Sequence, residues 1–179
     1  MLSDPELYEL AARVGHKLHA AGRRLATAES CTGGWVAKAL TDVPGSSEWF
    51  ECGYVTYSNA AKVRDLHVSP GTLEQFGAVS EQTVREMAEG ALRVTGATVA
   101  LAVSGIAGPG GGTADKPVGT VWFCGAARAG ATVDIIAEEQ FYAGDRAFVR
   151  GRALQHALRL ILRLDLPVRP EVSARLQHP

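Results

Sequence analysis

The sharpest constraint on the fold is a change of composition within residues 27–34. An apolar run at 24–28 gives way to the polar residues that include Ser30, and Gly33, Gly34 and a helix-like segment at 35–40 follow directly. Two glycines between a strand pattern and a helix pattern indicate a strand–turn–helix corner. At such a corner the side chain at the end of the strand lies at the carboxyl edge of the sheet, beside the free N–H groups of the next helix. Ser30 is therefore the first candidate nucleophile.

The remainder of the chain alternates between helix and strand patterns. Apolar spacing and capping residues predict helices at 3–22, 60–66, 81–95 and 145–164, and β-forming residues predict strands at 49–57, 99–103, 118–127 and 132–141. The continuous apolar run at 99–103 is typical of a strand covered on both faces, whereas the last two strands are expected to pair antiparallel. The predicted class is therefore α/β with a mixed sheet.

Length and composition suit one globular domain. The chain has 179 residues, of which 46% are hydrophobic and 21% are charged, close to the average for globular proteins. A domain of this size buries about 70% of the surface that its unfolded chain exposes. From Pro167 the chain is polar and contains further prolines, so we expect a single domain over residues 1–166 and a frayed tail over 167–179.

Charge and hydropathy argue against two classes of partner. A formal net charge of -1 provides no basic field for a nucleic-acid backbone. No run approaches the roughly 20 apolar residues of a membrane span. The start of the chain, residues 1–6, is acidic and lacks the pattern of a secretion signal. The sequence therefore predicts a cytoplasmic protein that binds neither nucleic acid nor a membrane.

No residue pattern indicates a metal or a disulfide. Cys31, Cys52 and Cys124 form an odd set without CxxC spacing, which fits neither a disulfide framework nor a zinc site. His16 and His19 lie three residues apart, a spacing that by itself is commoner on a solvated helix face than in a metal site. We therefore expect reduced thiols and no metal.

Polar clusters lie at the ends of three predicted strands, at 29–34, 57–62 and 104–113. Ligands of α/β sheets bind outside the carboxyl ends of the strands, so these clusters are expected to meet at one edge of the sheet. That edge is the predicted site.

The first two clusters suggest a Ser–Lys pair. A serine hydroxyl needs a base to take its proton, and no His or Asp pattern near Ser30 marks a triad. Lys62 becomes a candidate base if desolvation lowers its pKa from about 10.4 toward 7 or 8. Tyr57 is then a candidate proton relay between the two. The alternative is structural: Ser30 caps the following helix and Lys62 lies on a solvated helix face.

Three further features also allow both a chemical and a structural interpretation. Cys31 is a rival nucleophile beside a helix N-terminus, or a packed apolar residue without a nearby His partner. The glycine-rich segment 105–112 offers backbone amides to an anion but lacks the ending of a Walker loop, and it equally suits a mobile entry to a hairpin. Arg146 carries a fork that suits phosphate or carboxylate, or it is solvated.

Taken in order, these motifs resemble the CinA C-terminal domain family, whose stand-alone members are nicotinamide-nucleotide amidohydrolases. The matching segments span nearly the whole chain apart from the tail, at 28–34, 44–47, 57–59, 77–80, 104–109, 117–121 and 144–146. The resemblance implies a three-layer α/β/α sandwich with a mixed, mostly parallel sheet. It also implies hydrolysis of the carboxamide of nicotinamide mononucleotide, with no metal and no organic cofactor.

The resemblance further implies roles for individual residues. Ser30 matches the family nucleophile, Lys62 the base and Tyr57 the neighbouring active-site tyrosine, while Ser104 and Arg146 match substrate-binding positions. Ser104 stands where some relatives have Thr, a difference that preserves the hydroxyl. We expect the wider substrate-binding set to be Gly33, Gly34, Asn59, Ser104, Gly105 and Arg146, with N–H groups near the first two glycines holding an oxyanion.

A non-catalytic domain that binds nucleotides or proteins in competence or the response to DNA damage is the alternative function. Lys62 discriminates between the two, because a binding module has no use for a buried base beside Ser30. The expected partner is a small-molecule pyridine nucleotide. A homo-oligomer, in the simplest case a dimer, is left open.

Overall fold

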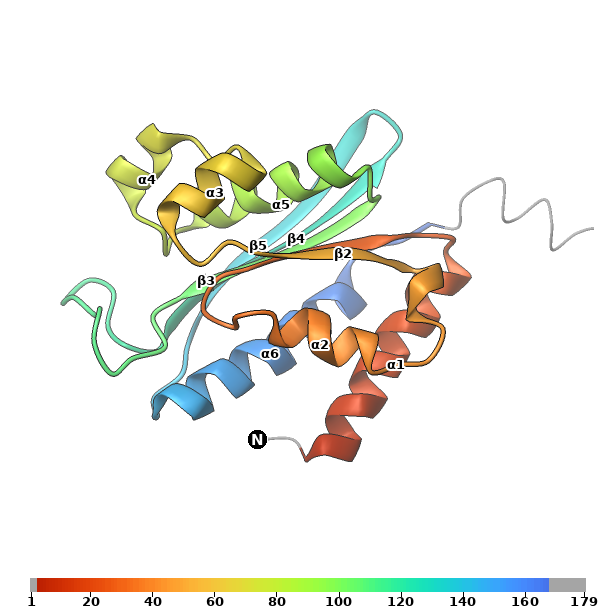
Figure 1. Cartoon of the computed structure of the whole chain (residues 1–179), viewed down its shortest axis with the longest axis horizontal. Helices are drawn as coiled ribbons and strands as arrows, with labels where there is room; N and C mark the ends of the chain where they lie inside the picture. The colour runs from red at the N-terminus through yellow and green to blue at the C-terminus, as the bar shows by residue number, and fades with distance from the viewer. Residues whose placement is uncertain (1–2, 168–179) are drawn as a thin grey trace, which may run out of the picture.

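A five-stranded sheet of order β2-β1-β3-β4-β5 forms the middle layer of the computed structural model, which describes residues 3–167 (Figure 1). The strands are β1 (Leu25–Glu29), β2 (Phe50–Val55), β3 (Val99–Gly105), β4 (Thr120–Ala129) and β5 (Thr132–Phe141). β2, β1 and β3 pair in parallel, and β4 pairs antiparallel with both β3 and β5. Four of the five strands therefore run in one direction, and the mixed, mostly parallel sheet is confirmed. The expected tail lies outside the described residues except for Pro167.

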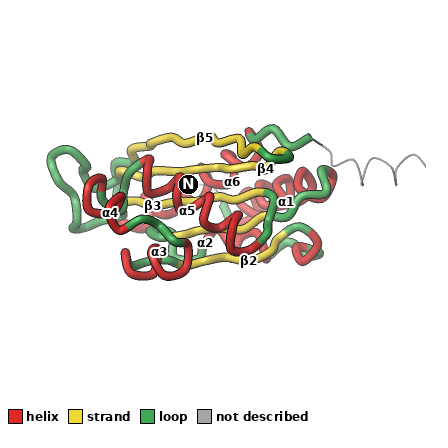
Figure 2. The backbone as a smooth tube through the Cα atoms, turned by 90° about the horizontal axis from the view of Figure 1, so that it is seen from above, coloured by secondary structure: helices red, strands yellow, loops and turns green. Residues whose placement is uncertain are grey.

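Helices cover both faces of the sheet. They are α1 (Asp4–Ala20), α2 (Trp35–Thr41), α3 (Asn59–Leu66), α4 (Pro70–Phe76), α5 (Glu81–Thr95) and α6 (Arg146–Arg163). In Figure 1, α1, α2 and α6 lie on one side of the sheet and α3, α4 and α5 on the other. The view from above in Figure 2 shows the strands running side by side between these layers. The α/β/α sandwich that the resemblance implies is thus present.

The residues that begin and end the helices are those that the sequence marks. The N–H of Ser3 donates to the Glu6 carboxylate at 2.8 Å, which completes the capping box of α1. Ser80 and Asp145 accept hydrogen bonds from backbone N–H groups in the first turns of α5 and α6. Gly96 ends α5 in the left-handed conformation, with φ of 71°. These local signals explain why the long helices begin and end as predicted.

Two short elements were not expected from the sequence. They are α4 and a 3-10 helix at Ser46–Glu48. α4 begins after Ser69, whose hydroxyl accepts a hydrogen bond from a backbone N–H, and has Pro70 in its first turn. An element of 7 residues is too short to show a clear apolar period. The predicted strand at 49–57 is also shorter than expected, because β2 ends at Val55.

Successive side chains along β1 point to opposite faces of the sheet. Leu25 faces the apolar core under α1, α2 and α6, whereas Ala26 and Ala28 face the core under α5. The next two residues continue the alternation: Glu29 contacts α2, and Ser30 contacts α3. The fold therefore places the serine on the α3 and α5 side of the carboxyl edge.

Candidate active site

Ser30 and Lys62 form a buried pair at the carboxyl edge of the sheet. The Ser30 N–H donates to the Val103 carbonyl of β3 at 3.0 Å, which extends the parallel ladder by one residue. Lys62 lies in the first turn of α3, and its Nζ donates to Ser30 Oγ at 3.1 Å. The Lys62 side chain is fully buried, and only 8% of Ser30 is exposed. The structure thus brings together the two residues that the sequence indicates as nucleophile and base.

The surroundings of Lys62 favour its neutral amine. Its Nζ also donates to the backbone carbonyls of Thr56 at 2.8 Å and Tyr57 at 3.4 Å. In the described part of the chain, no carboxylate forms an ion pair with this ammonium. Desolvation by burial lowers the pKa of Lys62 to about 8. The interpretation of Lys62 as a solvated helix residue is therefore wrong.

The buried carboxylate of Glu29 holds the turn that follows Ser30. Its oxygens accept hydrogen bonds from the Thr32 hydroxyl at 2.7 Å and from the N–H groups of Gly34, Val36 and Ala37 at 3.0, 3.0 and 2.8 Å. Negative charge is stabilised at a helix N-terminus, where N–H groups lack partners. Glu29 was not among the predicted site residues, although a Glu inside an apolar strand pattern and directly before a helix is a usable signal.

Arg150 of α6 contacts the same turn and was also not selected. Its Nε donates to the Cys31 carbonyl at 3.0 Å and its Nη2 to the Thr32 carbonyl at 2.9 Å. Its Cζ lies 5.6 Å from the centre of the Trp35 ring. Arg150 follows Arg146 by four residues, a spacing that places both side chains on one face of a helix. That spacing is the only local signal for it.

Cys31 is not a nucleophile in this arrangement. Its thiol is buried in the apolar core under α1, α2 and α6. Desolvation by burial raises the pKa of the Cys31 thiol to about 12, so the thiol stays protonated near neutral pH. The alternative that Cys31 is a packed residue is confirmed.

Gly33 and Gly34 shape the turn but do not offer their N–H groups to a ligand. Their φ angles are 63° and 90°, in the left-handed region that favours glycine. The Gly33 N–H donates to the Ser30 carbonyl at 3.1 Å, and the Gly34 N–H donates to Glu29 at 3.0 Å. Because both glycine N–H groups are already paired, donors for an oxyanion near these glycines have to come from neighbouring residues.

The unpaired backbone N–H groups of this turn belong to the two residues that precede Gly33. Among residues 3–167, no protein acceptor pairs with the N–H of Cys31 or of Thr32. Both belong to the tight turn closed by the hydrogen bond from Gly33 to Ser30. They are the backbone donors nearest in sequence to the Ser30 hydroxyl.

Tyr57 and Arg146 lie together at the mouth of the site. Arg146 donates from Nη2 to the Tyr57 hydroxyl at 3.1 Å and from Nη1 to the Gly108 carbonyl at 2.9 Å. Tyr57 is 59% exposed, and only its backbone carbonyl contacts Lys62. The expectation that its hydroxyl relays a proton between Ser30 and Lys62 is therefore not met. Tyr57 directly precedes the N-cap of α3, so its backbone faces Lys62 while its side chain points outward.

The remaining predicted residues differ in how accessible they are. Ser104 is almost fully buried, and its hydroxyl donates to the Ala78 carbonyl at 2.7 Å. Gly105 ends β3, where an added Cβ would lie 2.7 Å from Val121, so the close approach of β4 requires glycine. Asn59 is the first residue of α3 and is exposed. Only Asn59 of these three presents an open side chain.

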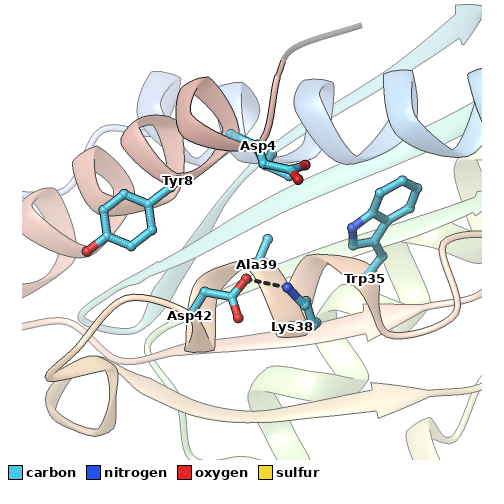
Figure 3. Close-up of a pocket in the computed structure, with 7 residues that line it drawn as sticks. Asp4, Tyr8, Trp35, Lys38, Ala39 and Asp42 are labelled. Atoms are coloured by element: carbon cyan, nitrogen blue, oxygen red, sulfur yellow. Dashed lines mark hydrogen bonds and ion pairs between the residues drawn. The ribbon is translucent and has the colours of Figure 1, made fainter.

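The pocket in Figure 3 lies away from this pair. It has a volume of about 180 Å³ and lies between α1 and α2, lined by Asp4 and Tyr8 of α1 and by Trp35 and Lys38 of α2. Neither Ser30 nor Lys62 lines it. It is therefore not part of the candidate site.

Within residues 3–167, no helix has both the length and the apolar character needed to cross a bilayer. The same residues contain no group of three His, Cys, Asp or Glu side chains placed to hold a metal ion.

Comparison with known proteins gives consistent matches over nearly the whole chain. The model of the CinA C-terminal domain matches residues 7–164. Nicotinamide-nucleotide amidohydrolase PncC of Enterobacter agglomerans is 54% identical over 162 residues, covering 90% of this chain and 97% of that protein. The protein of the same name from Escherichia coli (strain K12) is 51% identical over 160 residues, covering 89% of this chain and 95% of that protein.

A solved structure agrees with the fold. The crystal structure of the competence/damage inducible protein CihA from Agrobacterium tumefaciens superposes with a TM-score of 0.84 at 43% identity, covering 90% of this chain and 96% of that chain. The three-layer architecture is therefore shared with a protein of similar length.

We predict that Glu29→Gln lowers the free energy of unfolding by about 2–4 kcal/mol, because the amide nitrogen of Gln cannot accept and leaves buried N–H groups unpaired. Denaturant unfolding followed by circular dichroism measures the difference. The matched control is Glu48→Gln, an exposed carboxylate that pairs only with the exposed His19, and it should leave the stability unchanged. Equal stability of Glu29→Gln and the wild type would contradict the proposed support of this turn.

Proposed function

This chain belongs to the CinA C-terminal domain family and is an amidohydrolase, and we propose that it hydrolyses the carboxamide of nicotinamide mononucleotide. The products are nicotinic acid mononucleotide and ammonia. The observation that carries the mechanism is the 3.1 Å hydrogen bond between Lys62 Nζ and Ser30 Oγ in a buried environment. A desolvated amine beside a serine hydroxyl is an arrangement for nucleophilic catalysis.

In the first half of the proposed reaction, the neutral amine of Lys62 takes the proton of the Ser30 hydroxyl as Oγ attacks the carboxamide carbon. The positively charged pyridine ring withdraws electrons from this carbon and favours the attack. The Lys62 ammonium then returns its proton to the amide nitrogen, the C–N bond breaks, and ammonia leaves. Ser30 is left as an ester of the nicotinic acid group.

In the second half, water attacks the ester. Lys62, neutral again, takes a proton from the water, and its ammonium then protonates Ser30 Oγ as the C–O bond of the ester breaks. One water is consumed, and both Ser30 and Lys62 return to their starting states. One base can serve both halves because Lys62 Nζ lies 3.1 Å from Ser30 Oγ, the atom that loses a proton in the first step and regains it in the last.

The developing oxyanion needs donors close to Ser30. We assign this role to the N–H groups of Cys31 and Thr32, which have no protein acceptor among residues 3–167. Preorganised backbone donors of this kind are worth about 10²- to 10³-fold in turnover each. Gly33 and Gly34 contribute through the backbone conformation that only they adopt without strain.

The phosphate of the substrate requires a cation, and Arg146 is the candidate. Its guanidinium lies at the mouth of the site between Tyr57 and the glycine-rich loop that contains Gly108. A planar guanidinium can bind phosphate through two parallel hydrogen bonds. The N-terminus of α6, at which Arg146 stands, adds a favourable dipole for an anion. Tyr57 is then a wall of the binding site and a partner of Arg146.

A non-catalytic binding module is the less favoured alternative. Burying a lysine amine against a serine is energetically unfavourable because the amine loses its hydration, and a module that only binds a nucleotide has no use for this arrangement. No other observation in the described residues favours it over the amidohydrolase.

We predict that Ser30→Ala abolishes release of ammonia from nicotinamide mononucleotide, because no other activated nucleophile lies at the corner. The melting temperature should change little. The matched control is Cys31→Ala, which removes a protonated thiol and should retain activity. An inactive Cys31→Ala protein together with an active Ser30→Ala protein would overturn the assignment of the nucleophile.

The pH dependence should report the Lys62 amine. Below the pKa of Lys62, about 8, the amine is protonated and cannot act as a base, so kcat/KM should fall about tenfold per pH unit on the acidic side. Lys62→Met should be inactive across the whole pH range. The control Lys38→Met removes an exposed lysine paired with Asp42 and should keep the wild-type profile. A fully active Lys62→Met protein would exclude the Ser–Lys mechanism.

Arg146→Ala should lower kcat/KM for nicotinamide mononucleotide by about 10- to 100-fold, the effect of losing one charge-assisted pair. The slow turnover of free nicotinamide, which carries no phosphate, should be nearly unchanged. Parallel ammonia assays on the two compounds measure the difference. If Arg146→Ala hydrolyses both compounds with the kcat/KM of the wild type, the phosphate is bound elsewhere.

A further inference from the structure

Arg150 connects the last helix to the turn that carries the nucleophile. Its guanidinium is half-buried and donates to two successive backbone carbonyls, those of Cys31 at 3.0 Å and Thr32 at 2.9 Å. An added Cβ at Gly33 would lie 3.4 Å from Nη2, so the guanidinium lies directly against the turn.

The geometry of the peptide group determines what these contacts do. The carbonyl of Cys31 and the N–H of Thr32 belong to one planar trans peptide, in which the two groups point in opposite directions. Arg150 draws the Cys31 carbonyl toward α6, on one side of the sheet. The Thr32 N–H is therefore turned away from α6, toward the side on which α3 brings Lys62 to Ser30.

The charge of Arg150 also affects the strength of that donor. A hydrogen bond from a guanidinium to a carbonyl is charge-assisted, and it polarises the peptide so that its N–H becomes a better donor. The Thr32 N–H has no protein acceptor among residues 3–167. The polarised donor is thus available to a ligand.

We propose that Arg150 is a positioning residue of the amide hydrolysis: it holds and polarises the peptide between Cys31 and Thr32 so that the Thr32 N–H meets the oxyanion formed after attack by Ser30. This inference rests on the proposed function. Arg150 does not touch the substrate, and its contribution is expected in the transition state rather than in ground-state binding.

Two features of the site make arginine the residue required. Two adjacent carbonyls need two donors in a fixed geometry, which the fork of a guanidinium supplies and a single ammonium does not. The guanidinium also lies over the Trp35 ring, with its Cζ 5.6 Å from the ring centre. Stacking restricts the orientation of the fork.

The chain offers a matched control on the same helix. Arg152 also lies over an aromatic ring, with its Cζ 5.8 Å from the centre of the Tyr142 ring. No hydrogen bond from Arg152 to the turn at 31–34 is present in the described structure. Replacement of Arg152 therefore removes a stacked arginine from α6 without releasing the turn.

The experiment compares steady-state kinetics of Arg150→Ala, Arg150→Lys and Arg152→Ala with nicotinamide mononucleotide. Arg150→Ala should lower kcat by about 10- to 100-fold while KM changes by less than about threefold. Arg150→Lys should recover only a minor part of the loss. Arg152→Ala should behave like the wild type. The midpoint of the acidic limb should be the same in all active variants, because Lys62 keeps its surroundings.

A rescue measurement separates positioning from a general loss of structure. Guanidinium ion, added to Arg150→Ala at concentrations far below those that unfold proteins, should raise kcat, because it can occupy the vacated space and bind both carbonyls. Ammonium ion at the same concentration should not. Thermal unfolding of each variant establishes that the folded protein is assayed, and Arg150→Lys provides the kinetic comparison if Arg150→Ala does not fold.

The outcomes distinguish this inference from the proposed function. An active wild type with an equally active Arg150→Ala would overturn the role of Arg150 and leave the amidohydrolase standing. A rise in KM with unchanged kcat would also overturn it, since that is the pattern of ground-state binding. A wild type that releases no ammonia would overturn the proposed function and this inference with it.

Discussion

The buried carboxylate of Glu29 is the interaction on which the site depends. Glu29 is the last residue of β1, and its carboxylate accepts hydrogen bonds from N–H groups at the start of α2 and from the Thr32 hydroxyl. A carboxylate without such donors would be unstable in an apolar interior, and the N–H groups would lack partners without the carboxylate. Each stabilises the other, and together they hold the turn between strand and helix. Because those N–H groups are paired within the protein, the donors of this turn without an acceptor among residues 3–167 are the earlier ones, at Cys31 and Thr32.

Alternation along one strand separates structural support from chemistry. Glu29 and Ser30 are neighbours in sequence, so their side chains leave the sheet on opposite faces. Glu29 is surrounded by donors from α2, whereas Ser30 meets the buried amine of Lys62 from α3. The burial that lowers the pKa of Lys62 to about 8 comes from the packing of α3 against the sheet and α5. The proposed base is therefore a consequence of the three-layer fold.

Helix α6 contributes at two depths. Arg146, in its first turn, reaches the exposed mouth beside Tyr57, and Arg150, one turn later, reaches the carbonyls behind Ser30. The two guanidinium groups share a helix face but have different surroundings. In the proposed function one meets the phosphate of the substrate, and the other acts through the backbone. Because α6 carries both arginines, one helix fixes the distance between the proposed phosphate-binding group and the turn that carries the nucleophile.

Local sequence patterns determined most of the helices and strands, because capping residues such as Ser80 and Asp145 act within one turn. They also identified Ser30 and Lys62 as candidates, since both follow strands that end at the same edge of the sheet. Tertiary structure alone decided that Lys62 is buried against Ser30 and that the Tyr57 hydroxyl points away from both. It also revealed Arg150, which is separated from Cys31 by 119 residues. A periodicity or a capping signal reports interactions between residues that are close in the sequence. The burial of a side chain, its pKa and the pairing of a backbone N–H group depend instead on which distant segments of the chain the fold packs against that residue.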